Sequence, residues 1–192
     1  MFKDQAHSAD STTAGLVAKT GFGESAKGGG VFHVQCFGED GVLKWEDQMH
    51  NLVVNVGLQD MNTKYFAGST YTASWFLGLV TGPGSGTTYA AADTLASHAG
   101  WTEFTNYSGN RKAVTFGTAT TADPSVISSS ASPAQFSITG AGGTVAGAFL
   151  CSVSSGTSGL LFSEADFQSP GDRVVVSGDT LNVTYTFSLD AA

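Results

Sequence analysis

Hydrophobic and polar side chains alternate most regularly near the C-terminal end of the chain. In LNVTYTFSL, residues 181–189, every second residue from Leu181 to Leu189 is apolar, and the residues between are Asn, Thr or Ser. A period of two is typical of a β-strand with one face on a core. VFHVQCF, 31–37, alternates in the same way. With the turn cluster that follows it and VLKWED beyond, it predicts a β-hairpin over 31–47.

Two segments carry a helical pattern instead. Apolar residues recur at helical spacing between Leu58 and Tyr65, and Gly68 is placed to end the element, which predicts a helix over roughly 55–67. A second, shorter helix is predicted in AAADTLASHAG, residues 90–100.

The other apolar segments are short and are separated by Gly, Ser or Pro, which is typical of strands joined by turns. They are ASWFLGLV, KAVTFGTAT, AQFSIT, TVAGAFLCSV and SGLLFSEA. Many short strands at close spacing favour a sandwich over a parallel sheet. We therefore expect a mainly β protein: a jelly-roll-like β-sandwich over residues 31–192, with one or two short helices and an extended N-terminal arm over residues 1–30.

The segment 1–30 differs from the rest because it is polar and rich in Gly, Ala, Ser and Thr. It has too few large apolar residues for a core of its own, and the run 28–30, three glycines, is expected to act as a hinge. We predict that this arm becomes ordered only against neighbouring subunits; a solvated tail is the alternative. The residues expected to anchor it are Phe2, Leu16, Val17 and Phe22.

Composition narrows the classes of partner. Charged residues make up 12% of the chain, about half the usual share, and the net charge is -8. An acidic chain does not suit binding to nucleic acid, and no apolar run is long enough to span a bilayer. The N-terminus lacks the apolar core of a secretory signal, which favours synthesis in the cytoplasm. Cys36 and Cys151 lie in apolar patterns and are expected to be buried free thiols.

The stretch SHAGWTEFTNYSGNRK, 97–112, gathers side chains that often carry chemistry. No nucleophile motif occurs near it, the histidines lack metal-ligand spacing, and the glycine runs lack the order of a phosphate loop. We expect no catalytic residue, metal or cofactor, and we expect the three tryptophans to pack in the core. The stretch is instead interpreted as a structural polar cluster in which Arg111 pairs with Glu103 or Asp93 and His98 satisfies a backbone carbonyl.

Three blocks of the chain are distinctive in their amino-acid sequence and in their order. They are GVLKWEDQMHNLVVNVGLQDMNTKYFAGSTYTASWFLGLV at 41–80, AADTLASHAGWTEFTNYSGNRKAV at 91–114, and the run AQFSIT, AGAFLCSV and GDTLNVTYTFSL within 134–189. Together they resemble a family of small structural proteins of tailed bacteriophages. The resemblance implies a capsid cement or decoration protein on the virion surface, made in the host cytoplasm. It also implies a homo-oligomer whose partner is the major capsid protein, and it supplies no active-site residues.

Two other classes stay open. A tail, neck or fibre component with an adhesin-like role would use exposed aromatic side chains and long loops, for which 81–90 and 154–159 are the expected segments. A glycan-acting enzyme would need two carboxylates across a cleft, and the nonlocal pair to test is Glu103 with Glu164 or Asp166.

Overall fold

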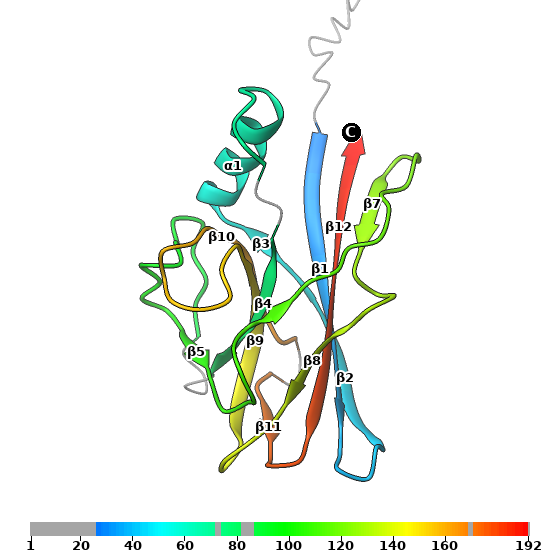
Figure 1. Cartoon of the computed structure of the whole chain (residues 1–192), viewed down its shortest axis with the longest axis vertical. Coiled ribbons are helices and arrows are strands. Elements are labelled where there is room, and N and C mark those ends of the chain that lie inside the picture. The colour runs from blue at the N-terminus through cyan, green and yellow to red at the C-terminus, as the bar shows by residue number, and fades with distance from the viewer. Residues whose placement is uncertain (1–25, 72–73, 82–86, 169–170, 192) are drawn as a thin grey trace, which may run out of the picture.

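A computed structural model describes residues 26–71, 74–81, 87–168 and 171–191. Within these ranges the chain forms one α-helix and twelve β-strands, arranged in two antiparallel sheets (Figure 1). The expected mainly β architecture is confirmed, and it has the form of a β-sandwich. Jelly-roll connectivity remains a prediction.

The first sheet has the strand order β2–β1–β12–β7, and β8 also pairs with β12. Its two long strands lie side by side over their whole length, from Ala26 opposite Ala191 to Phe37 opposite Thr180. The alternation at 181–189 has the predicted effect over most of β12, because Leu181, Val183 and Tyr185 are buried while the residues between them face outward. The strands of this sheet are β1 (Ala26–Phe37), β2 (Leu43–His50), β7 (Ser125–Ser128), β8 (Ala134–Ser137) and β12 (Thr180–Ala191).

The second sheet has the order β3–β10–β9–β4–β5, with β11 paired to β9 and β6 paired to β4. Strands β9 and β10 are buried along most of their length. A strand covered on both faces loses the polar alternation of a half-exposed one, which explains the continuous apolar run of β9. The strands are β3 (Leu52–Val53), β4 (Phe76–Thr81), β5 (Thr102–Phe104), β6 (Lys112–Ala113), β9 (Gly143–Cys151), β10 (Leu161–Asp166) and β11 (Arg173–Val175).

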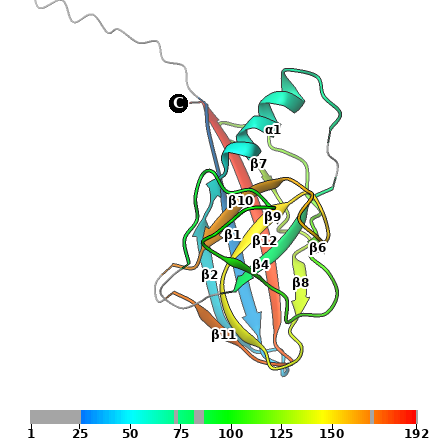
Figure 2. The same cartoon turned by 90° about the vertical axis from the view of Figure 1, so that its left-hand side faces the viewer.

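Helix α1 (Asn55–Tyr65) occupies the predicted position and ends two residues earlier than expected. Its first turn sits on β10 so closely that a Cβ at Gly57 would lie 2.5 Å from the carbonyl oxygen of Phe162. Gly68, with a φ of 68°, follows the helix in the left-handed conformation that glycine tolerates best. Figure 2 shows α1 standing at one end of the sandwich rather than across a sheet face.

The main core fills the space between the two sheets. The first sheet contributes residues such as Phe32, Val34 and Tyr185, and the second contributes Leu77 and Leu150. Burial of the apolar side chains of this core is the main driving force for folding. Cys36 and Cys151 are buried free thiols, as predicted. Trp101 is buried, and Trp45 and Trp75 pack against the core while partly exposed, so the expected core role of the tryptophans is confirmed.

A second apolar cluster covers the outer face of the second sheet. The connection at 87–101 lies over this face and contributes Leu95 and Trp101, which pack with Val80 and Phe149 of the sheet. The ring of Phe149 lies directly over Gly78, in the space that a side chain there would occupy. The second sheet is therefore covered on both sides.

Three predictions about local structure are wrong. The segment KAVTFGTAT, predicted as a strand, contributes only the two residues of β6, and 114–120 have no regular secondary structure. Residues 90–100 form turns with a single bridge between Thr94 and Ser97, not a second helix. Two interactions hold this segment in turns despite the helix propensity of its alanines. Leu95 is buried against the second sheet, and the Asp93 side chain accepts a hydrogen bond from the Ala90 N–H. The glycines at 28–30 belong to β1 and pair with β12, so they are not a hinge. The arm residues Phe2, Leu16, Val17 and Phe22 lie outside the described residues.

In the part of the chain that the structure describes, the single helix of eleven residues is too short to cross a membrane.

Candidate functional site

The outer face of the first sheet carries mostly uncharged polar side chains over β12 and its neighbours, and it carries the ionisable side chains His33 and Glu46 where β1 pairs with β2. We call the uncharged part of this face the neutral polar face. Register aligns its members across strands: Gln35 and Gln135 both lie opposite Asn182, and Ser128 lies opposite Thr186. Several members bond to one another, as in the 2.7 Å contact between the Ser128 and Thr186 hydroxyls. The face consists of Gln35 of β1, Ser128 of β7, Gln135 of β8, and Asn182, Thr184, Thr186 and Ser188 of β12.

The neutral polar face departs from the usual solvated face of an antiparallel sheet. Such faces normally carry many Lys and Glu side chains. Here the neighbouring carboxylate of Glu46, on β2, already accepts hydrogen bonds from Gln35 and His33, which lower its pKa. Neutral hydroxyl and amide groups can bond to a second protein without the cost of burying charge. The chemistry of this face therefore suits a large, polar protein–protein contact.

Arg111 and Glu103 form the strongest part of the predicted polar cluster. Arg111 Nε donates to Glu103 Oε1 at 2.8 Å and Nη2 donates to Oε2 at 2.7 Å, a two-bond geometry that fixes both groups. Nη1 also donates to the carbonyls of Val153 and Gly156, at 3.2 and 2.9 Å. Arg111 is 7% exposed, and its guanidinium carbon lies 5.2 Å from the ring centroid of Phe149. Arg111 thus ties the 152–160 loop to β5.

Trp101 is the centre of a second polar network. Its indole Nε1 donates to Glu164 Oε2 at 2.9 Å, and its ring stacks on His98 with centroids 3.7 Å apart. His98 Nδ1 donates to the Trp101 carbonyl at 3.1 Å, so the predicted carbonyl contact is confirmed. These contacts fix the end of the 87–101 connection on the outer face of the second sheet.

Asp93 does not join Arg111. Its charge acts on Glu164 instead, which is fully buried on β10. Burial, followed by the charge of Asp93, raises the pKa of Glu164 to about 8. Burial also raises the pKa of Tyr89 and of Asp166, and neighbouring carboxylates add to both shifts. The polar cluster predicted as one unit is therefore two networks on the same side of the sheet.

The carboxylate pair considered for glycan cleavage is not arranged for it. Glu103 is on β5, while Glu164 and Asp166 are on β10, and β4 and β9 lie between. Three strand spacings separate the backbones by about 14 Å. Both Glu103 oxygens are held by Arg111, and Glu164 is buried beside Trp101. These contacts are structural in character.

Sequence reasoning missed two links between distant segments. One is Trp101 with Glu164, for which a glutamate inside the apolar segment LLFSEA, 160–165, was the available signal. The other joins the start of β2 to the residue before β12, where Lys44 Nζ donates to Asp179 Oδ2 at 2.7 Å beside the Cys36 thiol. Burial, followed by the Asp179 charge, raises the pKa of Cys36 to about 12. This link borders an open depression at the β1–β2 turn.

In the described ranges, no group of three His, Cys, Asp or Glu side chains is arranged to hold a metal ion.

Comparison of the chain with models of protein families, with curated proteins and with solved structures finds no match.

Proposed function

We propose that the protein is a structural component of a tailed-bacteriophage virion, a cement or decoration protein that binds the outer capsid lattice through the neutral polar face. The resemblance of blocks 41–80, 91–114 and 134–189 to phage structural proteins directs the proposal to a virion. The neutral polar face is the observation that carries it, because it offers many hydrogen-bonding groups and little charge to desolvate.

A cement role requires binding and no turnover. A protein that binds the assembled lattice, and not its separated subunits, stabilises the lattice by RT ln(1 + [L]/Kd) per site, about 2.7 kcal/mol at a free concentration of one hundred times Kd. Repetition over a symmetric shell multiplies modest contacts. A scaffold in which Arg111 and Trp101 pin the long connections suits a subunit that must stay rigid while it binds. In this proposal the partners are the major capsid protein and further copies of the chain.

A tail, neck or fibre component is the second candidate. Exposed aromatic side chains at one end of the sandwich favour it, because rings of this kind serve in adhesin contacts. They are Tyr65, Phe66 and Tyr71.

Copy number separates these candidates. Quantitative mass spectrometry of purified particles, with the major capsid protein as internal standard, should find hundreds of copies per particle for a cement protein. A few to tens of copies would favour the tail, neck or fibre role. Absence from purified particles would contradict both.

A further inference from the structure

Three aromatic side chains project into solvent where α1 ends. Tyr65, Phe66 and Tyr71 are 83%, 80% and 70% exposed, and the rings of Tyr65 and Phe66 meet edge to face with centroids 4.8 Å apart. We call these three residues the aromatic end patch. Single exposed apolar residues are ordinary, but three exposed rings in a segment of seven residues are a typical mark of a contact surface.

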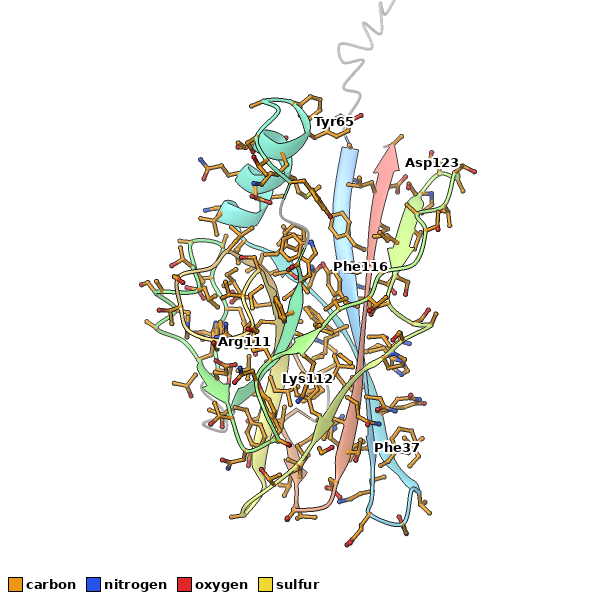
Figure 3. All side chains as sticks on the ribbon, in the orientation of Figure 1. Phe37, Tyr65, Arg111, Lys112, Phe116 and Asp123 are labelled. Carbon is orange, nitrogen blue, oxygen red and sulfur yellow. The ribbon has the colours of Figure 1, made fainter. Side chains whose placement is uncertain are left out.

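The aromatic end patch lies at the end of the molecule where the described chain begins. Figure 1 shows the start of β1 and the C-terminal end of α1 at the same end of the sandwich, and Figure 3 shows the Tyr65 side chain at that end. Leu189, opposite Gly28 in the β1–β12 pair, adds a partly exposed apolar side chain at this end. Residues 1–25 join the sandwich here, at Ala26.

Those 25 residues carry apolar side chains within reach of the patch. Phe22 is four residues before Ala26, and Val17 is nine residues before it. Nine extended residues span up to about 30 Å, whereas the eleven residues of α1 span about 16 Å. The chain between Val17 and Ala26 is thus long compared with α1, so Leu16 and Val17 have the reach that docking at this end of the sandwich requires.

We propose that residues 1–25 dock on the aromatic end patch of their own chain, with Leu16, Val17 and Phe22 covering its rings. Tethering favours this occupant, because a ligand on a short linker has an effective concentration in the millimolar range. A second copy at micromolar concentration competes poorly with it. The surface that orders the arm is then the C-terminal end of α1 in the same chain, and not a neighbouring subunit. It does not depend on the proposed function.

A spin label can test the docking in the full-length protein. Ala18→Cys places a nitroxide next to Val17, while the two native thiols are buried and should not react. We expect the label to broaden and remove the backbone amide signals of Tyr65 and Phe66 in an isotope-labelled chain. In a control mixture, one set of chains carries the spin label without isotopes and the other carries the isotopes without the spin label. The signals of Tyr65 and Phe66 should stay intact in this mixture, because the contact is within one chain.

Matched surface variants complete the test. Changing Tyr65, Phe66 and Tyr71 to Ser should restore the α1 amide signals in the labelled chain, and the fold should survive because all three side chains are exposed. The control changes Val42, Val174 and Val176 to Ser; these exposed valines lie at the other end of the sandwich, and broadening should persist. Unchanged signals in the labelled parent chain, or broadening in the mixture, would overturn the proposal.

Discussion

Replacing Arg111 by Met should destabilise the protein more than the loss of any surface charge. Met retains an unbranched apolar stem against Phe149 but leaves Glu103 without its partner and two loop carbonyls without their donor. Removing one member of a buried ion pair costs about 3–5 kcal/mol. The Glu103 side chain is 25% exposed, so water can solvate part of its charge, and the lower end of that range applies. We expect a loss of about 3 kcal/mol in the free energy of unfolding.

Urea unfolding followed by tryptophan fluorescence measures this loss, and Lys112→Met is the matched control. Lys112 is the next residue, carries the same charge and bonds one carbonyl at the surface, so its replacement should cost less than about 1 kcal/mol. Adding Glu103→Gln should cost less in the Arg111→Met background than in the parent, with a coupling of about 1–2 kcal/mol. Equal losses for Arg111→Met and Lys112→Met, or strictly additive effects, would refute the reasoning.

Three further predictions concern separate parts of the molecule. Because the pKa of Glu164 is raised to about 8, the protonated side chain adds to the free energy of unfolding in full below pH 4.5, and this addition is lost as pH rises through 8. The urea midpoint should therefore fall more between pH 4 and 9 in the parent than in Glu164→Gln. Parallel curves for the two proteins would contradict this. Gly78→Ala should lower the free energy of unfolding by roughly 1–3 kcal/mol because a ring covers that position, whereas Gly29→Ala, with no atom within 4 Å of the added carbon, should be neutral in the same assay. Thr184→Lys should reduce occupancy on purified capsids because it adds charge to the neutral polar face. The control Thr157→Lys, in a loop beside the other sheet, should bind as the parent does. Equal occupancy of the two variants would count against the neutral polar face as the binding surface.

Local pattern predicted the long elements and failed where burial came from distant segments. Strand β12 and helix α1 were predicted because each shows its own period over about nine or more residues. Residues 90–100 have helical composition, yet the outer face of the second sheet holds Leu95 in a turn. Strands β7 and β11 have four and three residues, too few to display a period. Their positions are set by pairing with β12 and β9.

The polar cluster shows the same limit. Glu103 and Arg111 are eight residues apart, so a local argument was enough to predict their pairing. Glu164 is 63 residues from Trp101, and only the packing of β10 beneath the 87–101 connection brings them together. The neutral polar face was visible as hydroxyl-rich alternation in β12. The width of the face could not be predicted, because β7 and β8 join it through pairings that the sequence does not reveal.

The antiparallel contact of β1 with β12 bears on how the chain is made. These strands are separated by more than 140 residues, yet β12 is the shared partner of β1, β7 and β8. During translation, β1 and β2 can form their hairpin early, but one edge of β1 stays open until residues 180–191 leave the ribosome. A fold that depends on such a late, nonlocal pairing is slow to complete. The nascent chain therefore has a long interval in which an unpaired strand edge is exposed to chaperones, or to the same edge of another nascent chain.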